Sequence, residues 1–194
     1  NAIYIEQEHI EKVKLDISKS TFENNGDNSS SSLIVSFCGE VIFEDNEVKY
    51  TDKTKTCSAL YLNVPRSLTL LRSNFANCVT TIDSSVTLTN QNDNSLTTIK
   101  SCTFINCKAN QNTIIISGGL AEVEDCSVSF ENNNENSACC SINFLSKGIS
   151  CKYSKFTKSY SSGSITYDQP NGKSDSILVS DCIFDDCGGP NSRC

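Results

Sequence analysis

Apolar and polar positions alternate along this chain in a short pattern that recurs about six times. Each copy reads apolar, any, apolar, two residues, a small residue, any, Phe, any, Asn or Asp, and then Asn, Cys or Ser. The copies span residues 15–25, 68–78, 97–107, 123–133, 149–159 and 177–187, and a looser copy ends at Asn46. Because side chains of a strand alternate between its two faces, apolar residues two positions apart predict strands rather than helices.

Three positions of the pattern are expected to form columns when the copies stack. The anchoring aromatic residues are Phe22, Phe43, Phe75, Phe104, Phe130, Phe156 and Phe184. A small residue two positions earlier points the same way, at Ser20, Ser73, Cys102, Val128, Ser154 and Cys182. A polar turn position follows the aromatic residue, at Asn24, Asp45, Asn77, Asn106, Asn132 and Asp186, with Lys158 as the exception. Asn and Asp suit turns because they tolerate left-handed backbone angles.

The repeat predicts a solenoid, because one short strand cannot bury its apolar face alone and stacked copies can. We expect an all-β fold, a right-handed single-stranded parallel β-helix of about seven coils, with residues 1–194 forming one domain. Thr97 and Asp125 interrupt the apolar alternation, and register slips of one or two residues are expected there. The polar segments 45–55 and 159–175 are expected to be loops at one edge of the rod.

The F-x-x-N spacing at residues 22–25, 43–46 and 130–133 resembles the repeats of polymorphic outer-membrane-protein passenger domains. Similar repeats occur in surface proteins of some protists. The segment S-G-G-L at residues 117–120 looks like the small-small-apolar motif that accompanies these repeats. The resemblance implies a β-helical surface or adhesive protein, from which this chain departs in its cysteine content.

Twelve cysteines predict an oxidising, extracytoplasmic location and a coil stapled by disulfides. The candidates are Cys38, Cys57, Cys78, Cys102, Cys107, Cys126, Cys139, Cys140, Cys151, Cys182, Cys187 and Cys194. Two pairing schemes are open. Cys102 with Cys107, and Cys182 with Cys187, would bond within a coil. Cys78 with Cys107 would instead bond between coils, at an expected separation of about 4.8 Å.

No motif in the chain marks an active site. His9 is the single histidine and no C-x-x-C is present, so zinc ligation is not expected. Asp185 and Asp186 are adjacent, whereas glycoside cleavage needs two carboxylates on one face. We expect no enzyme, with no catalytic residue, metal or cofactor. The alternative is a carbohydrate-active β-helix, similar to polysaccharide lyases or hydrolases, or a glycan-binding one that uses the segment 159–175.

Charge and chain ends shape the expected partners. The net charge of −7 argues against nucleic acid, and no apolar run reaches the length of a membrane span. Asn28 begins a glycosylation sequon. Exposed coil ends invite strand addition, so we expect self-association through them, with a glycan or a cell-surface molecule as a further partner. The expected function is that of a secreted, extracellular or cell-surface structural or adhesive glycoprotein, stacking end to end into a filament.

Overall fold

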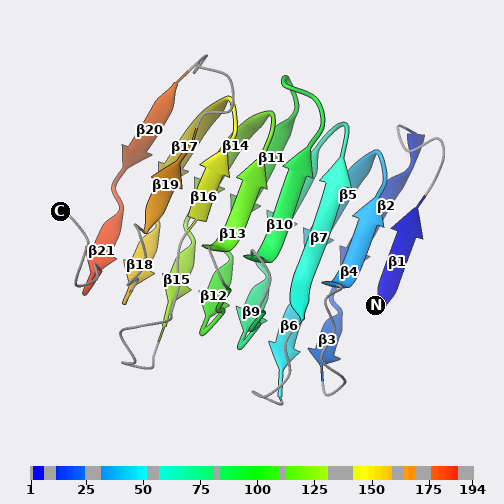
Figure 1. Ribbon diagram of the computed structural model, residues 1–194, viewed down its shortest axis with the longest axis horizontal. Coiled ribbons are helices and arrows are strands. Elements are labelled where there is room, and N and C mark those ends of the chain that lie inside the picture. The colour runs from blue at the N-terminus through cyan, green and yellow to red at the C-terminus, as the bar shows by residue number, and fades with distance from the viewer. Residues whose placement is uncertain are drawn as a thin grey trace.

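The computed structural model describes residues 2–6, 12–24, 32–51, 57–80, 84–109, 112–130, 142–158, 164–168 and 176–187. These residues form a parallel β-solenoid, whose coils lie side by side from β1 at one end to β20 and β21 at the other (Figure 1). The predicted all-β class and the parallel β-helix are confirmed. Cys139, Cys140, Cys194, Asn28 and His9 lie outside the described residues.

Three seven-stranded parallel sheets run along the rod, and we call them A, B and C in the order in which the chain visits them. Sheet A contains β1 (Ile3–Glu6), β4 (Ser32–Phe37), β7 (Ser58–Val64), β10 (Ser84–Asn90), β13 (Asn112–Ser117), β16 (Ile142–Leu145) and β19 (Ile165–Tyr167). Sheet B contains β2 (Lys14–Ser18), β5 (Glu40–Glu44), β8 (Leu68–Leu71), β11 (Leu96–Lys100), β14 (Leu120–Glu124), β17 (Gly148–Lys152) and β20 (Ile177–Ser180). Sheet C contains β3 (Thr21–Asn24), β6 (Glu47–Tyr50), β9 (Asn74–Ala76), β12 (Thr103–Ile105), β15 (Ser127–Ser129), β18 (Lys155–Thr157) and β21 (Ile183–Asp185).

The hydrophobic core is one continuous column enclosed by the three sheets. Sheet A contributes Leu60 and Val86, which pair directly, and sheet B contributes Leu70 and Ile99. All four side chains are fully buried. Alternate residues of the same strands face outward, which is the period of two that the sequence predicts.

The aromatic column of sheet C differs from the predicted one at two coils. Its members are Phe22, Val48, Phe75, Phe104, Val128, Phe156 and Phe184, with steps of 26, 27, 29, 24, 28 and 28 residues. Phe43 lies instead in sheet B, where it pairs with Ile17 and Leu70. Phe130 follows β15, two residues past the column position that Val128 takes. The register slips expected at Thr97 and Asp125 are absent. Thr97 pairs in register with Leu68 and Ala121, and the pairs Lys100–Glu124 and Thr103–Ser127 keep one register on both sides of Asp125.

Phe43 nevertheless supplies the ring that the second coil lacks. Its ring centroid lies 6.2 Å from that of Phe22 and 6.0 Å from that of Phe75. Phe75 and Phe104 then stack at 4.8 Å with almost parallel rings. The larger side chain therefore enters the core from the neighbouring sheet, beside the smaller Val48 in the aromatic column.

Two segments that the sequence predicts to be loops contain strands. Glu47–Tyr50 forms β6 within residues 45–55, because Val48 rather than Phe43 occupies the sheet C column. Ile165–Tyr167 forms β19 within residues 159–175 and pairs with β16. Each segment is polar overall and its strand has only three or four residues, so the composition of the segment does not predict the strand.

The small-small-apolar motif forms the turn from sheet A to sheet B. Gly118 and Gly119 have φ angles of 73° and 58°. A Cβ atom on Gly118 would lie 1.9 Å from the carbonyl oxygen of Asn90, and one on Gly119 would lie 2.3 Å from that of Ser95. Only glycine satisfies both the left-handed backbone and this close approach to the neighbouring coil.

Candidate functional site

The turn from sheet B to sheet C uses one residue in the left-handed region in every coil. We call this row the B–C corner, and its members are Lys19, Asp45, Arg72, Ser101, Asp125, Tyr153 and Asp181, with φ between 43° and 55°. A single left-handed residue turns the chain sharply while both flanking segments stay extended. None of the seven is glycine, so outward-facing side chains of varied charge form a ladder along this edge.

The next residue in every coil points inward and caps the corner. This inner column is Ser20, Asn46, Ser73, Cys102, Cys126, Ser154 and Cys182. The Ser73 and Ser154 hydroxyls donate to the carbonyls two residues earlier, at 2.8 and 2.9 Å. Cys102 and Cys126 donate in the same way through Sγ, at 3.4 and 3.2 Å. Ser and Cys therefore play one role, which is to donate a second hydrogen bond to a carbonyl that also accepts from the backbone amide of the corner residue in the preceding coil.

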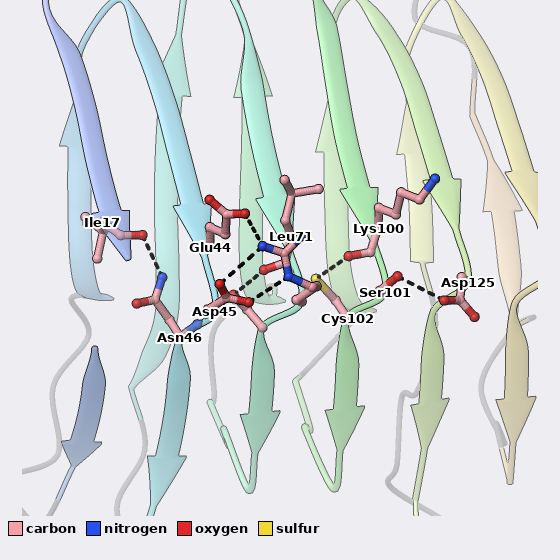
Figure 2. A network of polar contacts seen from close by, with 11 residues as sticks. Ile17, Glu44, Asp45, Asn46, Leu71, Lys100, Ser101, Cys102 and Asp125 are labelled. Atoms are coloured by element: carbon pink, nitrogen blue, oxygen red, sulfur yellow. Dashed lines mark hydrogen bonds and ion pairs between the residues drawn. The ribbon is translucent and has the colours of Figure 1, made fainter. Parts of the chain in front are cut away.

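Asn46 links three coils within this inner column. Its Nδ2 donates to the Ile17 carbonyl at 2.8 Å, and its Oδ1 accepts from the Ser20 amide at 2.9 Å. Its own amide donates to Ser73 Oγ at 3.1 Å. The longer amide side chain thus satisfies two backbone groups of the preceding coil, one of which is the Ile17 carbonyl (Figure 2). The following coil satisfies the backbone amide of Asn46 through the Ser73 hydroxyl.

Two thiols of the inner column, Cys102 and Cys126, are protonated at neutral pH. Burial raises the pKa of Cys102 to about 11 and that of Cys126 to about 12. A protonated thiol is a weak hydrogen-bond donor, which agrees with the Sγ-to-carbonyl contacts. These two groups act as small packing side chains and not as nucleophiles.

A charged clasp joins two coils at the B–C corner. Arg72 Nε lies 2.7 Å from Asp45 Oδ1, Nη2 lies 3.2 Å from Oδ2, and Nη2 also contacts Glu44 Oε1 (Figure 2). The hydrogen bonds from Arg72 lower the pKa of Asp45 below its ordinary value. The clasp borders a shallow depression of about 550 Å³, which is lined by Lys19, Ser20, Thr21, Asp45, Asn46, Glu47, Arg72 and Asn74.

Polar contacts continue along the same edge between the next coils. Lys100 Nζ lies 2.9 Å from Glu124 Oε2. Ser101 Oγ donates to Asp125 Oδ2 at 2.9 Å (Figure 2). Glu44, Asp45, Glu124 and Asp125 therefore have partners in the adjacent coil. Exposed pairs of this kind contribute little to stability.

The corner after sheet C is the turn column that the sequence predicts, except at Asn24, which is the last residue of β3 and pairs with Tyr50. Asn77, Asn106, Lys158 and Asp186 all have positive φ, between 50° and 57°. Lys158 therefore occupies the turn despite its side chain. Asp45 also turns the chain, but it belongs to the B–C corner, and Asn132 lies outside the described residues.

The nine described cysteines carry free thiols, so the predicted disulfide staples are not confirmed. They are Cys38, Cys57, Cys78, Cys102, Cys107, Cys126, Cys151, Cys182 and Cys187. Stacking places two pairs in shared columns, Cys78 with Cys107 and Cys102 with Cys126. Cys151 and Cys182 come from different positions of the pattern, yet their Sγ atoms lie 3.9 Å apart. Column reasoning missed this last contact, because it joins sheet B of one coil to the corner of the next.

The acidic pair considered for glycoside cleavage lies at the end of the rod. Asp185 ends β21 and Asp186 is the left-handed turn residue after it, and both are exposed. Within the described ranges, no three His, Cys, Asp or Glu side chains converge as a metal ion would require. The described residues contain no helix with the length and hydropathy of a membrane crossing.

The last coil exposes side chains that are buried in every inner coil. We call β19, β20 and β21 the terminal coil. Phe184 is 49% exposed, whereas Phe156 directly beneath it in the column is fully buried. Ile177 is 54% and Val179 43% exposed, although their column neighbours Ile149 and Cys151 are buried. The terminal coil thus presents an apolar cross-section of the core together with three strand edges.

No family model, curated protein or solved structure matches the chain. The parallel solenoid is therefore established by the structure, while the resemblance to passenger-domain repeats depends on the residues that carry it.

Proposed function

We propose that this protein is a non-enzymatic structural or adhesive β-helix of the cell exterior, whose rods associate end to end. The observation that carries the proposal is the terminal coil, where core positions such as Phe184 are half exposed. An apolar surface bordered by strand edges is a template for the addition of further strands. We propose that the first coil of a second copy of this chain binds to the exposed face of the terminal coil.

The first coil has matching residues in the same columns. Leu15, Ile17 and Phe22 occupy the columns that end at Ile177, Val179 and Phe184. Head-to-tail docking would continue all three sheets in register and place aliphatic on aliphatic and Phe on Phe. Because the two surfaces differ, this contact is heterologous and would propagate into an open fibre.

Charged residues at the two ends make the orientation testable. In the docked register, Lys19 of one copy meets Asp181 of the next in the B–C corner, as Arg72 meets Asp45 within the rod. Glu23 meets Asp185 in sheet C, which places like charges opposite each other. The first contact favours docking and the second opposes it.

Composition and the repeat support the location and the surface role. Twelve cysteines in 194 residues are typical of extracytoplasmic proteins. The F-x-x-N repeats resemble those of polymorphic outer-membrane-protein passenger domains and of protist surface proteins. The sequon at Asn28 agrees with a secreted glycoprotein.

Sedimentation velocity and electron microscopy over a range of protein concentrations test the association. We expect short rods at low concentration and linear stacks at high concentration. Lys19→Glu should weaken the association and Glu23→Lys should strengthen it, each by up to about tenfold in the midpoint concentration. All four facing side chains are exposed, so both variants should keep the fold.

Phe184→Asp tests the apolar part of the contact, and it should abolish the stacks. The matched control is Ile105→Asp, which changes an exposed apolar residue on the outer face of β12 in the middle of the rod. A dispersed monomer at all concentrations, or equal effects of the two Asp variants, would overturn the proposal and indicate that other coils or another partner cover the terminal coil.

A further inference from the structure

Two thiols meet where the terminal coil joins the coil before it. Cys151 lies in β17, and Cys182 follows the B–C corner of the terminal coil. Their Sγ atoms are 3.9 Å apart, and Cys182 Sγ also lies 3.6 Å from the Cys151 carbonyl oxygen. A disulfide bond is about 2 Å long, so the two sulfur atoms need to approach by about 2 Å.

This pair differs from the other stacked thiols in its accessibility. Cys78 and Cys107 are fully buried, so an oxidant in solution cannot reach either of them without opening the coil. Cys151 is also fully buried, whereas Cys182 is only half buried. The pair therefore combines a solvent-accessible thiol, Cys182, with a buried thiol, Cys151.

We propose that Cys151 and Cys182 form a reversible disulfide that fastens the terminal coil to the coil before it. The oxidant is a small disulfide such as oxidised glutathione. The Cys182 thiolate attacks one glutathione sulfur, forms a mixed disulfide and releases one glutathione thiolate. The Cys151 thiolate then attacks Cys182 Sγ, forms the protein disulfide and releases the second. Two protein thiols are oxidised, one oxidised glutathione is reduced to two thiols, and the two protons pass to the leaving thiolates.

The buried thiol makes the second step dependent on pH. Burial and the neighbouring Cys182 raise the pKa of Cys151 above its ordinary value, and a hydrogen bond with Ser154 opposes this. Cys126 is the other ionisable group that faces it, and Cys126 is itself protonated. The thiolate fraction of Cys151 rises about tenfold per pH unit below this pKa, so the rate of ring closure should rise about a hundredfold between pH 7 and pH 9.

Peptide mapping of the full chain tests the pairing directly. The reduced protein is incubated with oxidised glutathione at low protein concentration, quenched with a thiol-alkylating reagent, and digested with trypsin and an Asp-specific protease. These cuts separate Cys182, in residues 181–184, from Cys187. We expect residues 148–152 linked to residues 181–184, with a mass two hydrogen atoms below the sum of the two peptides. The mapping does not depend on end-to-end association, so its failure would leave the proposed function standing.

Cys182→Ser and Cys102→Ser form a matched pair of variants, because serine already occupies this inner column at Ser73 and Ser154. Cys182→Ser should remove the linked peptide and leave Cys151 unmodified, while Cys102→Ser should give the wild-type link. A link from Cys182 to any other cysteine, or full alkylation of both residues after oxidation, would overturn the proposal. So would a rate of closure that does not change between pH 7 and pH 9.

Discussion

At the scale of single residues, the B–C corner keeps the same left-handed backbone angle in every coil although the residue type varies. Asp45, Asp125 and Asp181 suit this position, because Asp adopts left-handed angles more readily than most residues. Arg72 and Tyr153 do not, yet they adopt φ angles of 43° and 52°. Neighbouring coils impose the turn through the backbone hydrogen bonds from Arg72 to Lys100 and from Tyr153 to Ser180. Stacking between coils therefore stabilises a left-handed backbone conformation that is unfavourable for Arg72 and Tyr153 in isolation.

Tyr153→Asn should stabilise the protein by about 0.5–1 kcal/mol, because Asn has a smaller penalty for left-handed angles. The Tyr153 side chain is 58% exposed, so little packing is lost. Urea unfolding followed by circular dichroism measures the change in the free energy of unfolding. Tyr153→Ala is the control, because it removes the ring but keeps a Cβ atom and an ordinary preference for negative φ. Equal stabilisation by both variants would show that the ring, and not the backbone angle, is unfavourable.

At the scale of the strand, stacked rings order the core. Phe75 on β9 and Phe104 on β12 lie 4.8 Å apart with an interplanar angle of 4°, and both are fully buried. Phe156 on β18 and Phe184 on β21 stack in the same way, at 5.2 Å and 7°. The two pairs differ in their surroundings, because Phe184 has no described coil above it.

Phe104→Ala should cost about 3–5 kcal/mol in the free energy of unfolding, since it leaves a cavity between two fixed coils. Phe184→Ala should cost less than about 1.5 kcal/mol, because half of the ring is already in water. Chemical unfolding of both variants at a concentration where the rods are separate measures the difference. Similar costs would mean that Phe184 is covered in solution.

The strand scale also shows what the sequence can and cannot predict. Period-two alternation and the recurring Phe identify the parallel stack. They misplace Phe43 and Phe130, because the pattern seeks an aromatic residue where the coil uses Val48 and Val128. The strands of sheet A lie outside the motif on which the predicted alignment is built. They too repeat apolar residues two positions apart, as at Leu60 and Leu62, Val86 and Leu88, and Ile114 and Ile116.

The candidate sites divide in a similar way. The sequence predicts the column that Cys78 and Cys107 share, because columns follow from register alone. It misses the column of Cys102 and Cys126, because the predicted alignment places Val128 there. It does not predict the contact between Cys151 and Cys182, which depends on how far each side chain reaches across the coil. The clasp of Arg72 on Asp45 is hidden for the same reason, since the two residues are 27 positions apart and one was assigned to the other corner.

At the scale of the whole molecule, stability is distributed along one axis. Each coil contacts mainly the coil before and the coil after it, as the pairing order of the strands shows (Figure 1). Inner coils are supported on both sides, whereas the first coil and the terminal coil each pair on one side only within the described chain. Local unfolding should therefore begin at the two end coils and proceed inward.

Hydrogen exchange should report this order directly. At low protein concentration, we expect the amides of β20 and β21 to exchange well before those of β11 and β12, because the terminal strands lack a partner on one side. If rods stack as proposed, raising the concentration should slow exchange in β20 and β21 and leave the inner strands unchanged. Uniform exchange along the rod, measured by mass spectrometry of peptic fragments, would contradict the gradient.

The near-constant step between coils has a consequence for how such a chain can grow. Matched positions of the sheet C column are 24 to 29 residues apart throughout. The entropic cost of loop closure depends on the length of the loop being closed, so the seventh coil closes a loop no longer than the second did. Once one coil exists, each later coil folds on a finished template, as a monomer adds to the end of a polymer. Duplication of such units in a gene could therefore lengthen the rod without raising the entropic cost of closing each coil.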